Sequence, residues 1–298
     1  MLTVNLETVA FLRVSTVGLS LRTVLKTQIA SPPGVYFKLK EVIDNPYGTF
    51  DQITEIIMSD PGLAARLLKI ANSSFYGLSA KVETINHALS IIGSDQLSEM
   101  ALATSMVSRF DGLPKGLVDV DQFWRHNVAC GVAARHIAIH KNLERPEWYY
   151  LAGVLHDLGK LILLKEIPED YANVLAEVRG ESSLRLLDVE TQILKFNHTQ
   201  VGSILLKEWK LPPSLVAAIS YHHDPMNASG YVTEASVIHV ADYLAYKIGI
   251  SDGCESAAPY FISQTLAYLD LDVEFMKEAR HAVEEHTNQI VQSFRTKK

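Results

Sequence analysis

Cysteine is scarce in this sequence: Cys130 and Cys254 are the two thiols among 298 residues. Two cysteines cannot build a framework of several disulfides, or the paired Cys-x-x-Cys motifs of a zinc ribbon. Cys130 lies in an apolar run with helical spacing, where a free thiol behaves as a small apolar side chain. We therefore interpret it as a core residue and expect no disulfide framework.

Positive charge is also in short supply. The chain has 27 Lys and Arg residues against 34 Asp and Glu residues, a formal net charge of −7. It contains no basic cluster with interleaved aromatic residues. Nonspecific nucleic-acid binding depends on positive side chains that neutralise phosphates. We therefore expect no nucleic-acid partner.

Long apolar runs are missing as well. No run approaches the roughly 20 apolar residues that a transmembrane helix needs, so we expect no membrane-spanning segment. Residues 1–30 are apolar and mildly basic, but Glu7 comes early and no clean hydrophobic region follows. They do not resemble a signal peptide, and we assign them no secondary structure. With 48% apolar and 20% charged residues, the composition is that of a globular, cytoplasmic protein.

Signals for helix boundaries recur along the chain and predict an all-α fold. Capping residues precede apolar runs of helical spacing at many places, among them Thr49, Asp60, Asn197 and Thr233. A Pro-Gly break at Leu113–Gly116 separates two helical regions. We divide the chain into four parts: an N-terminal segment (1–30), an N-terminal helical half (31–112), a second helical half (113–253) and a C-terminal helical extension (254–298). The extension contains a helix predicted from Asp272 to about Ser293, whose apolar stripe should pack within the chain.

The N-terminal half offers little chemistry. Its one histidine, His87, lies on a mostly apolar helix, and we interpret it as a packed or half-exposed residue. The polar stretch Asn72–Gly77 is interpreted as a turn held by Asn and Ser side-chain hydrogen bonds, with a partner contact as the alternative.

The second half contains the motif Gly153–Lys160, in which His156 and Asp157 are adjacent. An imidazole nitrogen and a carboxylate oxygen together suit a first-row transition metal. Adjacent side chains on a helix point roughly 100° apart, so other helices must complete such a site. The candidate ligands come from five predicted helices and are His126, His156, Asp157, His198, His222, His223 and Asp242.

These residues predict one or two divalent ions of Fe, Mn, Ni or Zn. The alternative is a metal-free polar core in which the same side chains hydrogen-bond to one another. His136 and His140 form a separate pair near the end of a predicted helix. There a positive imidazole interacts favourably with the helix dipole, and we interpret both as solvated.

The chain resembles the HDOD family, the HD-related output domains of bacterial signalling proteins, from about Ser31 to Gly249. The blocks that carry the resemblance are Ser59–Phe75, His87–Gly93, Phe123–His126, Gly153–Lys160, His198–Gly202, Trp209–Pro212, Tyr221–His223 and Val237–Asp242. The resemblance implies an all-α, HD-domain/phosphodiesterase-like bundle with an N-terminal helical subdomain. It also implies a regulatory module that acts through protein partners in a signalling pathway.

The HD superfamily also contains metal-dependent phosphohydrolases, and the HD-GYP type hydrolyses cyclic di-GMP. The resemblance to that type places metal ligands at the same seven residues. It implies that Asp157 bridges the ions and that Lys160 neutralises a phosphate if the chain is an enzyme. The chain departs from the HD-GYP pattern in two places: Gln122 stands where a carboxylate ligand is expected, and Gly230-Tyr231-Val232 replaces Gly-Tyr-Pro. The leading hypothesis is therefore the signalling module. The alternative is a phosphohydrolase or phosphodiesterase acting on a phosphorylated small molecule or a cyclic dinucleotide.

Overall fold

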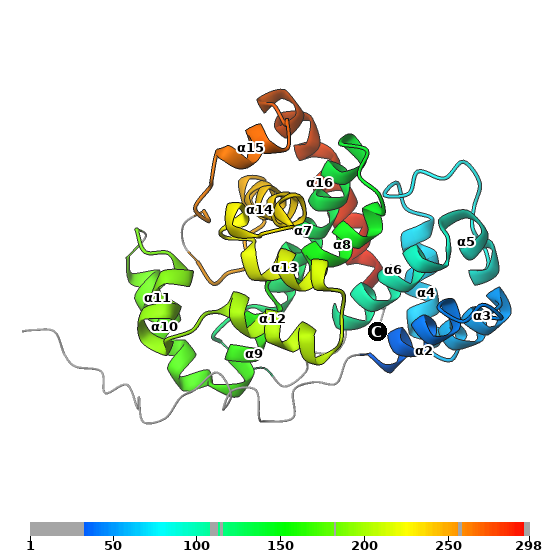
Figure 1. Ribbon diagram of the computed structural model, residues 1–298, viewed down its shortest axis with the longest axis horizontal. Helices are drawn as coiled ribbons and strands as arrows, with labels where there is room; N and C mark the ends of the chain where they lie inside the picture. Colours follow the sequence, from blue (N-terminus) through cyan, green and yellow to red (C-terminus); the bar gives the residue numbers. More distant parts are fainter. Residues whose placement is uncertain (1–32, 108–112, 114–115, 182, 256–257, 295–298) are drawn as a thin grey trace, which may run out of the picture.

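The computed structural model describes residues 33–107, 113, 116–181, 183–255 and 258–294 (Figure 1). Within these ranges every regular element is a helix and no strand occurs, which confirms the all-α prediction. No helix in the described ranges has both the length and the apolar character needed to cross a membrane. The N-terminal segment 1–30 and part of the boundary at residues 113–116 lie outside the described residues, and the division into four parts stays a prediction.

The N-terminal half is a group of short helices, drawn in blue and cyan in Figure 1. They are α2 (Gly34–Ile43), α3 (Phe50–Met58), α4 (Pro61–Ala71), α5 (Ile85–Ile92) and α6 (Ser94–Val107).

Local capping explains where α3 and α4 begin. The Thr49 hydroxyl accepts a hydrogen bond from the backbone of Gln52, and the Gln52 side chain accepts one from the backbone of Thr49. Asp60 caps α4 by accepting from Leu63 N at 2.9 Å, and Pro61 takes the first helical position, where its missing N–H costs nothing. Both helices therefore begin where the capping residues predict.

The Asn72–Gly77 stretch is a turn fixed by side-chain hydrogen bonds, as predicted. Asn72 Nδ2 donates to the carbonyl oxygens of Leu68 and Val82, both at 2.7 Å, and Val82 N donates to Asn72 Oδ1 at 2.8 Å. Ser73 Oγ donates to Ile70 O at 2.6 Å. His87 is half-buried, in agreement with its interpretation.

The second half surrounds a central pair of helices, α7 and α8 (Figure 1). Its helices are α7 (Val120–His140), α8 (Pro146–Leu155), α9 (Leu158–Glu166), α10 (Pro168–Gly180), α11 (Leu186–Leu194), α12 (His198–Glu208), α13 (Pro213–Tyr221), η1 (Pro225–Asn227) and α14 (Val232–Lys247). The predicted Thr233 cap is wrong, because α14 already begins at Val232 and Thr233 Oγ1 instead lies 3.2 Å from Tyr268 Oη.

Two glycines let α7 and α8 touch backbone to backbone. A Cβ atom on Gly153 would lie 2.6 Å from the Cα of Gly131, closer than real Cβ atoms approach. The pair therefore packs more tightly than helices with side chains at both positions. This contact places the end of α8 directly beside α7, where His126 lies.

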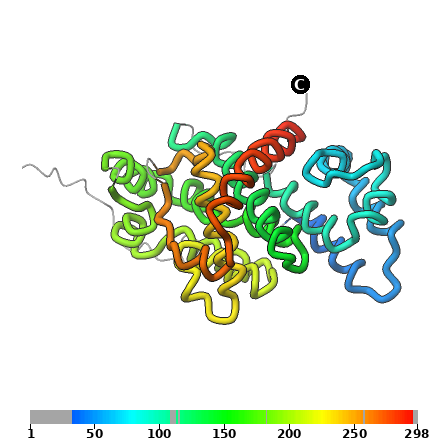
Figure 2. The backbone as a smooth tube through the Cα atoms, turned by 90° about the horizontal axis from the view of Figure 1, so that it is seen from above, coloured from blue at the N-terminus to red at the C-terminus, as the bar shows by residue number. Residues whose placement is uncertain are grey.

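The C-terminal extension joins the two halves. It consists of α15 (Gln264–Tyr268) and α16 (Val273–Phe294). Figure 2 shows α16, in red, running along the second half toward the N-terminal half, and it packs against both α7 and α4. Its buried face includes Phe275, Ala279, Val283 and Ile290, so the prediction that this stripe packs within the chain is confirmed.

Phe275 also bears on the interpretation of two histidines. Its ring centroid lies 5.7 Å from that of His136 and 4.2 Å from that of His140. His136 is half-buried, and burial lowers its pKa. The interpretation as solvated is therefore corrected for His136, whereas His140 is exposed as expected, although its ring also contacts Phe275.

Candidate metal centre

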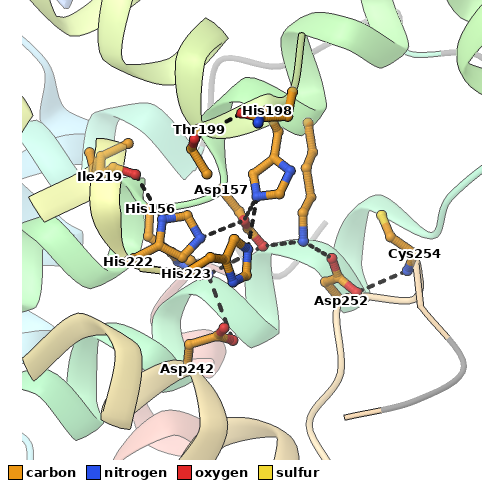
Figure 3. Close-up of polar contacts among 12 residues, drawn as sticks. His156, Asp157, His198, Thr199, Ile219, His222, His223, Asp242, Asp252 and Cys254 are labelled. Carbon is orange, nitrogen blue, oxygen red and sulfur yellow. Dashed lines mark hydrogen bonds and ion pairs between the residues drawn. The ribbon is translucent and has the colours of Figure 1, made fainter. Parts of the chain in front are cut away.

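His156 and Asp157 lie at a break between two helices. The sequence analysis treats the pair as adjacent residues on one helix, but α8 ends at Leu155 and α9 begins at Leu158. Asp157 leaves the helical conformation, with φ −101° and ψ 11°, and occupies the N-cap position of α9. The two side chains are therefore not held at the angular spacing of a continuous helix, and both point into one buried space (Figure 3).

A first group of polar atoms forms on one side of Asp157. His156 Nε2 lies 3.2 Å from Asp157 Oδ2 and 3.8 Å from Asp242 Oδ1. His126 Nε2 lies 3.1 Å from the same oxygen of Asp242. All four side chains are buried, and they come from α7, the α8–α9 break and α14.

A second group forms on the other side of Asp157. Asp157 Oδ1 lies 3.5 Å from His198 Nε2 and 3.8 Å from His222 Nε2. His223 Nε2 lies 3.1 Å from His198 Nε2. The structure thus brings all seven predicted ligands together, with Asp157 offering one oxygen to each group. Figure 3 shows six of them, all except His126.

Backbone carbonyls orient three of the histidines. The Nδ1 atoms of His126, His156 and His222 lie 2.8, 2.7 and 2.8 Å from the carbonyl oxygens of Ile250, Gly153 and Ile219. A carbonyl oxygen only accepts hydrogen bonds, so each Nδ1 carries a proton and each Nε2 is the atom directed inward. This arrangement is the usual outer partnership of metal-binding histidines.

Glu190 orients the fourth histidine and was not predicted. Its Oε2 lies 2.6 Å from His198 Nδ1 and accepts from the His198 backbone N–H at 2.9 Å. Its Oε1 accepts from Tyr171 Oη at 2.7 Å. In the sequence Glu190 is one acid on an amphipathic helix. The predicted helix start, with Asn197 as the cap and His198 as the first helical residue, gave no reason to expect a contact between Glu190 and His198. What distinguishes Glu190 as a functional residue is its complete burial, which only the folded structure reveals.

A glycine brings His198 close to Asp157. A Cβ atom on Gly159 would overlap the carbonyl oxygen of His198. The first turn of α9 therefore contacts the first turn of α12 directly, and only glycine permits this approach. The glycine of the Gly153–Lys160 motif thus contributes to the geometry of the centre.

The charges differ between the two groups. In the first group burial alone would lower the pKa of each histidine, but Asp157 raises the pKa of His156 well above its usual value, and Asp242 raises that of His126. Burial would raise the pKa of Asp157, yet the charges of His156 and Lys160 hold it well below its usual range. The first group is therefore a set of ion pairs in the absence of a metal.

In the second group His222 and His223 are neutral. Burial, reinforced by the charge of His156, lowers the pKa of His222 to about 3. Burial and the neighbouring His222 hold the pKa of His223 well below its usual value. Neutral imidazoles with inward lone pairs are the form that binds a metal.

Three buried atoms at the centre have no hydrogen-bond partner among the described residues: His156 Nε2, Asp157 Oδ1 and His222 Nε2. Buried polar atoms nearly always have a partner, and exceptions call for an explanation such as an ion. Imidazole nitrogens with carboxylate oxygens match the preferences of Fe, Mn, Ni and Zn. The residues present therefore fit a transition-metal ion.

Gln122 and Lys160 lie beside these groups. Gln122 is exposed, and its Nε2 donates to Ser251 Oγ at 3.1 Å, so it adds no charged ligand. Lys160 Nζ lies 2.7 Å from Asp157 Oδ2 and 2.8 Å from Asp252 Oδ2. Asp252 is a second buried acid that the sequence analysis missed, because it follows α14 in an irregular segment without a motif.

Comparisons with known proteins agree with this fold. The chain is 20% identical to an HDOD domain protein of unknown function from Geobacter sulfurreducens, with a TM-score of 0.75 over 92% of this chain and 97% of that one. It is 22% identical to a candidate phosphohydrolase from Shewanella amazonensis SB2B, with a TM-score of 0.73 and the same two coverages. An uncharacterised protein of Treponema pallidum (strain Nichols) is 24% identical over 197 residues, which span 64% of this chain and 37% of that relative.

The family model described as the HDOD domain matches residues 29–225, more than half of the sequence. The chain therefore belongs to the HDOD domain family.

Proposed function

We propose that this protein is a regulatory HDOD module of bacterial signal transduction, which holds one or two divalent transition-metal ions and acts through protein partners. The observation that carries the metal is the set of buried atoms without a hydrogen bond among the described residues: His156 Nε2, Asp157 Oδ1 and His222 Nε2. They come from the α8–α9 break and from the end of α13, and His222 Nε2 lies 3.8 Å from Asp157 Oδ1.

The donor atoms divide into two sets that share Asp157. His126, His156 and Asp242 would hold one ion with Asp157 Oδ2, and the second set, His198, His222 and His223, would hold another with Asp157 Oδ1. A bound divalent ion supplies Lewis acidity to a phosphoryl group or to water. The chain's own contribution is to direct the Nε2 atoms of the histidines inward through hydrogen bonds to their Nδ1 atoms.

The enclosure of the centre favours a regulatory role. The cavity lined by His126, Lys160, Asp242 and Asp252 has a volume of about 10 Å³, and the neighbouring one beside His223 has about 30 Å³. Pockets that bind small molecules usually measure about 300–1,000 Å³. Both cavities are far smaller than that.

The N-terminal half suits contact with a protein partner. It carries no candidate metal ligand, and several of its large apolar side chains are exposed: Phe37, Tyr47, Phe50, Met58 and Ile91. A contiguous apolar patch marks a surface that binds other proteins, and these side chains are the candidates for such a patch.

A metal-dependent phosphohydrolase is the second candidate. The pairing of two donor sets around one bridging aspartate favours it, because two ions a few ångströms apart can stabilise both oxygens of a phosphoryl displacement. Asp157 would then hold both ions. Lys160 would have to leave its pair with Asp252 to reach a phosphate on a small molecule or cyclic dinucleotide.

Metal analysis of protein purified without a chelating resin tests the proposal. We expect one or two Fe, Mn, Ni or Zn ions per chain in the wild type and in the control His281→Ala, whose side chain is exposed on α16. Asp157→Ala should lose most of the metal. Absence of metal from the wild type at neutral pH would contradict the proposal.

Assays on phosphoesters, including cyclic dinucleotides, with added Mn²⁺ or Fe²⁺ separate the two candidates. The regulatory module predicts bound metal without turnover. Turnover in the wild type that disappears in Asp157→Ala would establish the phosphohydrolase instead.

A further inference from the structure

Lys160 is an internal cation of the centre. Its side chain is 4% exposed, and Nζ lies within 2.8 Å of one oxygen each of Asp157 and Asp252. Glu255 Oε1 lies further away, at 4.0 Å. The ammonium group of Lys160 therefore donates its hydrogen bonds to carboxylates of this chain.

Asp252 is fixed independently of Lys160. Its Oδ1 accepts a hydrogen bond from Cys254 N at 2.9 Å, while Oδ2 faces Lys160. The segment around Asp252 is anchored on both sides by hydrogen bonds. Ile250 O accepts one from His126 Nδ1, and Gly253 O accepts one from Arg179 Nη2 at 2.8 Å. Both oxygens of Asp252 are thus engaged, and neither is directed at the two metal-binding groups.

The position of Lys160 creates an electrostatic conflict for metal binding. Asp157 is the acid shared by both groups, and a positive charge 2.7 Å from its Oδ2 opposes the approach of a divalent cation. In a buried site such a repulsion is screened little by solvent. A second negative charge next to the ammonium group offsets its repulsion of the metal ion. The carboxylate of Asp252 supplies this charge, 2.8 Å from Lys160 Nζ.

We propose that Asp252 is a positioning residue of the metal centre, acting through Lys160: it neutralises the ammonium group so that Asp157 keeps its negative charge for metal ions. This rests on the proposed metal binding. Asp252 lies outside the residues 29–225 that match the family model. The Lys160–Asp252 pair adds no net charge, so Asp157 Oδ2 stays available beside His156, and Oδ1 faces His198 and His222.

Co²⁺ affinity of the metal-free protein, measured by calorimetry, tests the role of Asp252. We expect Asp252→Asn to bind Co²⁺ about 10-fold or more weakly than the wild type, the range known for outer partners of metal ligands. The double variant Lys160→Met/Asp252→Asn removes both charges and should recover most of that affinity. Glu255→Gln should have the smaller effect, because its carboxylate is further from Lys160.

Glu147→Gln is the matched control, since Glu147 forms a buried ion pair with Arg135 at 3.1 Å outside the centre. It should leave Co²⁺ affinity unchanged. Thermal melting of each metal-free variant verifies folding.

The outcomes separate the two claims. Wild-type affinity in Asp252→Asn would overturn the inference alone. A loss that persists in the double variant would assign Asp252 a purely structural role and would also overturn it. A wild type that binds no Co²⁺ would overturn the proposed function and the inference together.

Discussion

At the scale of single residues, the centre depends on which atom of each side chain is already engaged. His126, His156 and His222 use Nδ1 on backbone carbonyls, and His198 uses it on Glu190. Each ring therefore turns Nε2 inward without the help of a metal. This preorganisation reduces the ordering cost that a metal ion would otherwise have to meet on binding.

Glu190→Gln tests this outer layer. The amide keeps the size of the side chain but loses the charge that faces His198 Nδ1 at 2.6 Å, so His198 becomes a poorer donor. We expect metal affinity to fall by about 10-fold or more, measured by competition with a chelating dye. Glu208→Gln, an exposed acid on α12, is the control and should bind metal like the wild type; equal affinity in both variants would refute the role of Glu190.

Glu99 makes the stability of the fold depend on pH, independently of the metal centre. Burial raises its pKa to about 7 from an ordinary value of 4.5, against the opposing charge of Arg145. Between these two pH values the folded state holds a proton that the unfolded state has released, so stability falls as the pH rises. The contribution amounts to at most about 3 kcal/mol.

Urea unfolding of wild type and Glu99→Gln at pH 5 and pH 7, in the presence of a chelator, measures this effect. The variant should lose less stability than the wild type over this interval. Glu255 has a pKa of about 7 as well, so some wild-type slope remains in the variant. Identical slopes in the two proteins would show that Glu99 is ionised in the fold.

At the scale of helices, the close contact between α9 and α12 sets the distance between Asp157 and His198. Gly159→Ala puts a methyl group against the carbonyl of His198, so α12 must move away. We expect a loss of about 1–3 kcal/mol in unfolding free energy together with weaker metal binding. Gly180→Ala is the control, because no atom lies within 4 Å of its added Cβ, and urea unfolding compares the two; equal stability would contradict the contact.

Helix boundaries show what local sequence determines. The caps at Thr49, Asp60 and Asn197 were predicted because each bonds to backbone only three residues away. The break at His156–Asp157 was not, because Asp157 leaves the helix to meet Lys160 and histidines from other elements. The seven candidate ligands were found by residue type and motif, whereas Glu190 and Asp252 were missed because burial distinguishes them from surface acids.

At the scale of the whole molecule, Arg135 connects the helix that carries His126 to the N-terminal half. Its guanidinium pairs with Glu147 at 3.1 Å, donates to Phe75 O at 2.9 Å and lies 4.2 Å from the centre of the Phe75 ring. The Asn72–Gly77 turn also bonds to α16, where Ser74 N donates to Gln289 Oε1 at 2.9 Å. The turn is therefore a junction between α7, α16 and the N-terminal half.

Arg135→Met should destabilise the fold by roughly 3 kcal/mol or more, because it leaves Glu147 buried without its partner. The double variant Arg135→Met/Glu147→Leu should recover part of the loss. Arg125→Met, which removes an exposed contact to Asn288 on α16, should change the unfolding free energy by less than about 1 kcal/mol. Denaturant unfolding of the three variants measures the differences, and a small effect of Arg135→Met would show that the junction contributes little.

The central claim is that the seven converging side chains hold divalent transition metal. Anomalous diffraction tests this claim. The protein is purified without a chelating resin and crystallised, and data are recorded on both sides of the Fe, Mn, Ni and Zn absorption edges. We expect one or two anomalous peaks beside Asp157, each about 2.0–2.1 Å from histidine Nε2 atoms. A centre without an anomalous peak, with His156, Asp157 and His222 hydrogen-bonded to one another or to water, would contradict it.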